Sequence, residues 1–264
     1  MRRRVKAGLL LLPLLSLFGT GLQRAGQPLE TETARLLPRG AFKLESTFEF
    51  QTSPDGLEKS APLAVEYGLL DNLELLVEPV FYAAISPDMG RHATGVGDLE
   101  VTLSCLFHHE SPAIPALAIA AEVKIPTAHD VLIGTGRTDY TPFIIVSKKL
   151  GRTELHANLG YTFVGQPPGP PLKNTLNYAV AGERRLNDRW VVVGELTGNT
   201  SSLTGSESSG PGSESSVIPE ASGGERVGLV GARYYLRPEM CFSLGVSYDN
   251  SRAILLRPGF TFRF

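Results

Sequence analysis

Two groups of histidine and acidic residues are the parts of this sequence whose types and spacing could do chemistry. The first is the run His108-His109-Glu110, whose imidazole and carboxylate groups are ligands that zinc accepts. Neighbouring residues on an extended chain point to opposite sides, however, and the run falls in an expected turn rather than on a helix with i, i+4 spacing. The sequence therefore predicts neither a metal site nor a cofactor.

The second group is His129-Asp130, with Asp139 nearby, in the segment 126–137. A histidine oriented by an acid can serve as the general base for a hydroxyl or thiol nucleophile. No recognisable motif places a serine or cysteine beside this pair, and the run 134–136 is too short for a phosphate-binding loop. We therefore expect a protein that is not an enzyme, with an outer-membrane hydrolase as the less favoured alternative.

The composition excludes several classes of protein. The 264 residues include 25 Lys and Arg against 27 Asp and Glu, a formal net charge of −2, and there is no basic block. This balance argues against a nucleic-acid partner. Cys105 and Cys241 make neither a disulfide framework nor a CxxC zinc site. A mean hydropathy near zero argues against a bundle of membrane-spanning helices, but it leaves a β-barrel open.

Residues 1–21 are predicted to form a secretory signal peptide. Four basic residues within the first six positions precede an apolar run over 7–18, and Gly19 and Gly21 supply small residues near the expected cleavage site. The run is shorter than the roughly 20 residues that a spanning helix needs. We therefore expect export, followed by a periplasmic segment over residues 22–40.

From residue 41 onward the sequence alternates with period two. In the window 42–51, apolar and aromatic residues interleave with charged and polar ones, which is the period of a β-strand. Most such windows span 9 to 12 residues, close to the roughly 9–11 that a tilted strand needs to cross a bilayer and longer than most soluble strands. Twelve strands are predicted, at 41–51, 60–69, 73–83, 98–108, 116–125, 138–149, 153–164, 174–185, 189–197, 225–236, 241–249 and 253–264.

The links between these strands alternate in length. Short turns are expected at 70–72, 150–152, 186–188 and 237–239, and longer links at 84–97, 126–137, 165–173 and 198–224. This alternation is typical of a barrel with tight periplasmic turns and longer outer loops. Two links depart from it, since residues 109–115 make a longer inner turn and residues 249–252 make a short outer link. The Ser/Gly/Glu-rich segment 198–224 is expected to be a flexible outer loop.

The fold class predicted is therefore all-β: a transmembrane, antiparallel, up-and-down β-barrel of about 12 strands over residues 41–264, in the outer membrane of a Gram-negative bacterium. The strands of a soluble β-sandwich would also alternate between apolar and polar residues, but their charged face would meet bulk water instead of enclosing a lumen. Strand length and the signal peptide favour the membrane barrel.

If the apolar face meets lipid, the opposite face lines a lumen. Ionisable groups on that face must be paired or hydrated. The lumen-lining candidates are Lys43, Glu45, Glu49, Glu66, Glu74, Glu78, Glu100, Glu122, Lys124, Glu154, His156, Asn177, Glu183, Glu195 and Arg257.

The last strand ends with alternating aromatic residues, Phe260, Phe262 and Phe264. This ending resembles the signal by which outer-membrane barrels are handed to the barrel-assembly machinery. The expected partners are therefore that machinery and outer-membrane lipid. Aromatic residues also fall near the predicted strand ends, where membrane girdles lie and where ordinary β-propensity would place them as well: Tyr67, Tyr82, Tyr140, Tyr161, Trp190 and Tyr248.

A series of short motifs between residues 95 and 161 resembles the outer-membrane barrel family named for the meta-pathway of phenol degradation, whose members are regarded as transporters. The motif residues are Gly95, Gly97, Asp98, Pro126, Thr127, Gly134, Gly136, Asp139, Asn158, Gly160 and Tyr161. The chain departs from the family at Ala128-His129-Asp130, where the family usually continues Pro-Thr with Gly-Asp, so the conformation of this loop is open.

The glycines of these motifs are expected to permit tight backbone at the barrel rim. Asp98 and Asp139 are expected to cap loop amides or to pair with Arg91 or Arg137.

The resemblance implies passage of small hydrophobic or aromatic molecules. The excess of glutamate among the lumen candidates predicts a mild preference for cations. A structural or surface-interaction barrel without transport, using the segment 198–224 to contact partners, is the alternative.

Overall fold

A computed structural model describes residues 28–168, 171–202 and 224–264. The expected signal peptide, residues 22–27 and most of the link 198–224 lie outside this part of the chain. The described strands are β1 (Phe42–Thr47), β2 (Glu49–Ser53), β3 (Gly56–Leu70), β4 (Leu73–Pro87), β5 (Ala93–Gly95), β6 (Leu99–His108), β7 (Ala116–Ile125), β8 (Asp139–Leu150), β9 (Thr153–Thr162), β10 (Thr175–Arg185), β11 (Trp190–Asn199), β12 (Arg226–Arg237), β13 (Met240–Asp249) and β14 (Ile254–Arg263).

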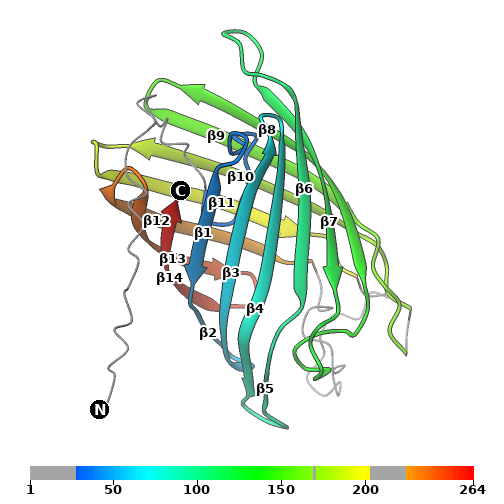
Figure 1. Cartoon of the computed structure of the whole chain (residues 1–264). Coiled ribbons are helices and arrows are strands. Elements are labelled where there is room, and N and C mark those ends of the chain that lie inside the picture. The colour runs from blue at the N-terminus through cyan, green and yellow to red at the C-terminus, as the bar shows by residue number, and fades with distance from the viewer. Residues whose placement is uncertain (1–27, 169–170, 203–223) are drawn as a thin grey trace, which may run out of the picture.

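These strands form one closed antiparallel sheet. Each strand pairs with its neighbour in the chain from β6 to β14, and β1 closes the wall by pairing with both β14 and β3 (Figure 1). Closure removes the unpaired edges that an open sheet would expose. The predicted up-and-down barrel is confirmed.

The fourteen strands occupy twelve positions in the wall, because two positions are each shared by two strands. β1 and β2 both lie between β3 and β14, and β5 and β6 both pair with β4. β1 and β2 are separated by a break at Phe48, which lies opposite Pro258 on β14. Proline has no N–H to donate to the strand ladder. The Phe48 N–H nevertheless donates to the Pro258 carbonyl at 3.0 Å. The twelve predicted strands therefore match the wall.

One hairpin is longer than predicted. β3 and β4 extend to a pairing between Gly56 and Pro87, so the expected long link 84–97 is partly strand. Gly56 adopts a φ of 141°, and a Cβ there would lie 2.4 Å from the Ser86 carbonyl oxygen. This close approach of two backbones, which only glycine allows, lets the ladder continue beyond the predicted strand end.

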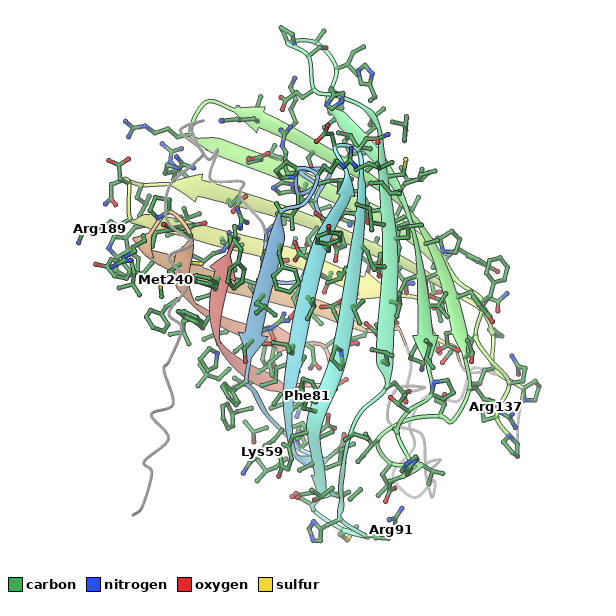
Figure 2. The ribbon with its side chains drawn as sticks, viewed as in Figure 1. Lys59, Phe81, Arg91, Arg137, Arg189 and Met240 are labelled. Carbon is green, nitrogen blue, oxygen red and sulfur yellow. The ribbon has the colours of Figure 1, made fainter. Side chains whose placement is uncertain are left out.

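Side chains alternate between the lumen and the outside, most regularly in β13. Cys241, Ser243 and Ser247 are buried, whereas Phe242 and Leu244 are about half exposed. Phe81 likewise projects from the outer wall, while charged residues such as Arg189 and Arg91 lie at the two rims (Figure 2). An apolar outer belt between charged rims is the surface of a lipid-facing barrel.

The two ends of the barrel differ in their links. The turn side carries short turns at residues 71–72, 151–152, 186–189 and 238–239 and the longer link 109–115. The loop side carries most of the longer links, with short ones at 54–55 and 250–253. Exposed aromatics lie near both ends, with Tyr67 and Trp190 toward the turn side and Tyr82, Tyr161 and Tyr248 toward the loop side. Among the described residues, no helix is long and apolar enough to cross a membrane.

Candidate functional site

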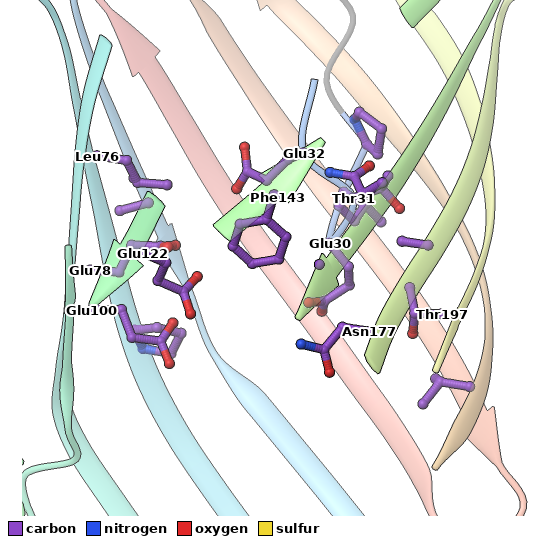
Figure 3. Close-up of a pocket in the computed structure, with 18 of the residues that line it drawn as sticks. Glu30, Thr31, Glu32, Leu76, Glu78, Glu100, Glu122, Phe143, Asn177 and Thr197 are labelled. Carbon is purple, nitrogen blue, oxygen red and sulfur yellow. The ribbon is translucent and has the colours of Figure 1, made fainter. Parts of the chain in front are cut away.

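The loop-side half of the barrel encloses a cavity of about 480 Å³. Its described lining includes nine glutamates and one arginine. The Phe143 ring and the Asn177 amide also line it (Figure 3). The glutamates belong both to the barrel wall and to the segment before β1. They are Glu30, Glu32, Glu45, Glu49, Glu66, Glu78, Glu100, Glu122 and Glu225.

Some of these carboxylates pair with lysine or arginine, and three others gather on one side of the cavity. Lys43 ion-pairs with Glu66 and lies 3.4 Å from Glu45, and Arg257 pairs with Glu30 and lies 3.3 Å from Glu49. Glu78, Glu100 and Glu122 share one side of the cavity (Figure 3) because Glu78 faces Glu100 across β4 and β6, and Glu122 lies on β7 beside them. The cavity therefore carries an excess of negative charge that attracts cations.

The floor of this cavity is the chain segment that precedes β1. The Glu195 carboxylate, on β11, accepts hydrogen bonds from the backbone N–H groups of Leu29, Glu30 and Thr31 and from the Thr31 hydroxyl. Glu195 is buried. A buried carboxylate is stable only when such donors replace water, so Glu195 and residues 29–31 fix each other in place.

Leu29 fits a seat in the wall made by two glycines. Gly231 and Gly245 face each other across β12 and β13, and a Cβ at either position would lie 2.5 or 3.0 Å from the Leu29 Cδ1 atom. The seat also packs Leu29 against Val193 and Leu229. Residues larger than glycine would therefore exclude this side chain from the wall.

From Leu29 the segment runs to the turn side along the inner wall. The Ala34 N–H donates to the Ser147 hydroxyl at 2.9 Å, and the Leu37 N–H donates to the Glu74 carboxylate at 2.5 Å. The Gly40 N–H then bonds to the Gly68 carbonyl at the rim at 2.7 Å. We call residues 28–40 the inner segment, because these contacts hold them inside the barrel.

The expectation of a periplasmic segment over 22–40 is therefore corrected for residues 28–40. The chain does not leave the barrel before β1, because buried acceptors on β4, β8 and β11 compensate its backbone N–H groups. The prediction for residues 22–27 lies outside the described residues.

Arg35 anchors the inner segment to the turn-side rim. Its guanidinium pairs with Glu110, in the link 109–115, and with Glu154, and Lys148 lies 3.3 Å from Glu110. Burial raises the pKa of the Glu110 carboxyl, but hydrogen bonds from Arg35, the Lys149 N–H and Lys148 outweigh it, so this pKa lies below its usual value. Glu110 is thus an ion-pair partner of Arg35 and Lys148.

The loop side is organised by three aspartates. Asp98 accepts the Ala128 N–H at 3.0 Å, and Asp139 accepts the Gly165 N–H at 2.7 Å and lies 2.7 Å from Lys124. The expected capping role is therefore present. Neither of the expected arginines appears in these contacts, since Arg91 pairs instead with Asp130.

Arg91 and Asp130 form a bidentate ion pair at 2.6 and 2.7 Å. The hydrogen bonds from Arg91 and from the Leu132 N–H lower the pKa of Asp130 to about 2. Because its carboxylate serves this loop contact, Asp130 is arranged to hold the loop rather than to orient His129 as a catalytic base.

The motif residues position the lumen wall and its loops. The Asn158 amide, oriented to satisfy both bonds, donates to the Glu32 carbonyl at 3.1 Å and accepts the Glu32 N–H at 3.2 Å. A Cβ at Gly160 would lie 2.5 Å from the Phe143 ring, and one at Gly134 would lie 2.7 Å from the Asp98 carboxylate. These glycines are needed for close packing. Thr127 donates to the Gly97 carbonyl at 2.7 Å, Gly136 adopts a φ of 67°, and Tyr161 projects outward.

The predicted lumen residues lie in four groups. Eight of them line the cavity: Glu45, Glu49, Glu66, Glu78, Glu100, Glu122, Asn177 and Arg257. Lys43 and Lys124 are ion-paired within the barrel, and Glu74 and Glu195 hold the inner segment. Glu154, His156 and Glu183 come together on the turn side.

Sequence reasoning missed several residues of the lumen, among them Glu32, Arg35, Ser147 and Arg233. Ser147 and Arg233 occupy inward positions of predicted strands, so the strand register alone could have identified them. Glu32 and Arg35 carried no such signal, because nothing in their sequence shows that the segment enters the barrel.

The comparisons with known proteins agree with this architecture. The family model described as "Putative MetA-pathway of phenol degradation" matches residues 25–264. The chain belongs to this family. No curated protein matches the sequence.

Solved structures share the fold of this member of the phenol-degradation family at low sequence identity. The NanC porin has a TM-score of 0.57 at 10% identity and covers 83% of this chain and 98% of its own. The KdgM porin has a TM-score of 0.56 at 11% identity, and the match covers 83% of this chain and 99% of the porin. The translocator domain of the autotransporter NalP from Neisseria meningitidis has a TM-score of 0.51 at 11% identity, and the match covers 86% of this chain and 90% of that domain. The fold is thus that of an outer-membrane barrel.

Proposed function

We propose that this barrel is a passive outer-membrane channel for small hydrophobic or aromatic molecules, and that its lumen favours uncharged and cationic solutes over anionic ones. The observation that carries the proposal is the cavity on the loop side, which combines an excess of carboxylates with the Phe143 ring. Aromatic rings bind flat apolar molecules, and negative charge adds attraction for a cationic group.

The family name and the fold support passage of small molecules, but the charge of the lumen sets this chain apart from one structural neighbour. The KdgM porin has been solved in complex with disordered oligogalacturonate, which is a polyanion. A lining of nine glutamates and one arginine would repel such a ligand. We therefore place anionic oligosaccharides outside the range of solutes for this barrel.

The inner segment crosses the turn-side half of the lumen. Residues 28–40 bond to opposite walls between the loop-side cavity and the turn-side rim, at Glu195, Ser147 and Glu74. Passage through the barrel then requires the inner segment to shift. This same feature favours the second candidate function, a structural or surface-interaction barrel that conducts nothing.

A matched pair of aromatic ions tests the proposal. The folded full-length barrel would be reconstituted in liposomes, and influx of benzyltrimethylammonium would be compared with influx of benzenesulfonate, which have similar size and opposite charge. We expect faster entry of the cation and slower entry of the anion. Equal rates would contradict the charge preference, and no entry of either ion above that of empty liposomes would favour the non-conducting barrel.

A further inference from the structure

Three side chains that can bind a metal meet on the turn side of the lumen. Glu154 and His156 lie two positions apart on β9 and therefore face the same side, and Glu183 on β10 lies directly opposite Glu154. One ligand atom from each of the three residues lies within 4.8 Å of the others. None of these residues contacts the loop-side cavity, so the cluster is separate from the channel site described above.

Two of these ligand atoms are buried and without a hydrogen-bond partner. His156 is 1% exposed and Glu183 is 4% exposed. The His156 Nε2 and Glu183 Oε1 atoms face each other at 3.4 Å, and neither makes a hydrogen bond to any other described group. An unsatisfied buried polar atom is costly. A cation between the two atoms would satisfy both.

The groups around the three residues form the outer contacts that a metal site needs. The Ser147 hydroxyl lies 2.8 Å from the His156 Nδ1 atom, so an Nδ1–H donated to Ser147 leaves the Nε2 lone pair for a metal. Arg233 donates to the Glu183 Oε2 atom at 3.1 Å, which leaves Oε1 as the ligand. Arg35 holds the Glu154 carboxylate. Metal-binding histidines and carboxylates are usually oriented by such second contacts.

The cluster also has a route to solvent and room for a further ligand. A turn-side cavity of about 260 Å³ is lined by Glu154 and Glu183 together with residues 151–153. A water from this cavity would supply the fourth ligand of a tetrahedral site.

We propose that Glu154, His156 and Glu183 form a divalent-metal site suited to Zn²⁺, with the fourth position open to the turn-side cavity. One imidazole nitrogen and two carboxylate oxygens are a ligand set that Zn²⁺ accepts, whereas Ca²⁺ and Mg²⁺ favour oxygen ligands alone. Arg35 and Arg233 remain on the outer oxygens and orient these carboxylates.

Zinc binding to the purified, folded barrel tests this site. The full chain would be prepared without a histidine tag, stripped with chelator and titrated with ZnCl₂ by calorimetry, with bound zinc counted by mass spectrometry. We expect one Zn²⁺ per chain at neutral pH. Titration with MgCl₂ should give no comparable binding.

Matched variants locate the ion. His156→Gln and Glu183→Gln should each lower zinc affinity at least tenfold, whereas His129→Gln and His109→Gln, which remove an imidazole elsewhere, should leave it unchanged. Heat-modifiable gel migration shows whether each variant is folded. If the buried variants do not fold, Glu154→Gln carries the test, since Glu154 lies at the edge of the turn-side cavity.

The proposal is overturned if the folded wild-type barrel binds no zinc saturably, because the cluster is then an ion-pair network with a proton shared by His156 and Glu183. It is equally overturned if zinc binding persists unchanged in folded Glu154→Gln and His156→Gln variants. Neither outcome depends on whether the barrel conducts, so the channel proposal stands or falls separately.

Discussion

Glu195 and Thr31 are joined by two hydrogen bonds to a single oxygen atom. The Glu195 Oε2 atom accepts the Thr31 backbone N–H at 2.8 Å and the Thr31 hydroxyl at 2.7 Å. The two residues lie 164 positions apart in the chain, so this contact ties the inner segment to the far wall of the barrel. Removing either partner leaves buried polar groups of the other unsatisfied.

The first prediction concerns this contact. Glu195→Ala should release the inner segment, because hydrogen bonds to a buried charged group each stabilise by about 1.5–3 kcal/mol. We expect a higher open probability of the channel in planar bilayers than in the wild type. The control is Glu225→Ala, which makes the same chemical change at the loop-side end of the cavity. Identical conductance in Glu195→Ala and wild type would show that the inner segment does not close the pore.

The second prediction uses the seat of Leu29. Gly245→Val should expel this side chain, since even a Cβ at Gly245 would lie 3.0 Å from its Cδ1 atom. Channel opening should therefore increase, and Leu29→Ala in the same chain should restore the closed state by making room for the valine. The measurement is single-channel recording of both variants.

Gly228→Val is the control for the Leu29 seat, because a Cβ there would lie 3.7 Å from Leu196, an exposed residue of the outer wall. It adds the same bulk without touching the inner segment. An equal effect of Gly228→Val and Gly245→Val would mean that wall strain, not the loss of the seat, changes opening.

Alternation along the sequence predicts the barrel well because lipid and lumen impose opposite demands on successive residues. In β13 every second residue is buried and the residues between are exposed, so the strand and its orientation follow from composition alone. The exception at β3 and β4 has a local cause, since only the close approach at Gly56 reveals that the hairpin continues.

The position of the inner segment cannot be predicted from the alternation of residues. Its position depends on partners such as Glu195 and Ser147, which lie more than 100 positions away, and the period-two pattern identifies inward side chains without showing what fills the lumen. The clustering of Glu154, His156 and Glu183 could not be predicted from this pattern either. All three residues were predicted to face the lumen, but their meeting depends on the register of β9 against β10.

The third prediction concerns the loop side and pH. The Arg91 hydrogen bonds lower the pKa of Asp130 to about 2, so the contact is fully present above the ordinary aspartate value of about 3.9 and is lost as the pH falls through about 2. We expect the loop to keep its conformation at pH 4. Arg91→Gln should raise the pKa of Asp130 toward its ordinary value, measured by NMR titration of its carboxyl carbon. An unchanged Asp130 pKa in this variant would contradict the ion pair.

The fourth prediction concerns selectivity. Replacing Glu78, Glu100 and Glu122 by Gln removes three charges from one side of the cavity without changing side-chain size. A unit charge about 4 Å from a permeating ion contributes about 1 kcal/mol even at the dielectric constant of water, so the preference for cations over anions should fall about fivefold or more. The measurement is the reversal potential across a bilayer with a KCl gradient.

The shift in reversal potential should shrink at 1 M salt, because screening then acts within about 3 Å. Asp88→Asn is the control, since Asp88 is an exposed residue that follows β4 at the loop-side rim and is absent from the cavity lining. If Asp88→Asn shifts the potential as much as the triple variant does, the field at the pore mouth sets selectivity. If neither shifts it, the permeating ions do not pass the acidic wall of the cavity, and the proposed route through it is wrong.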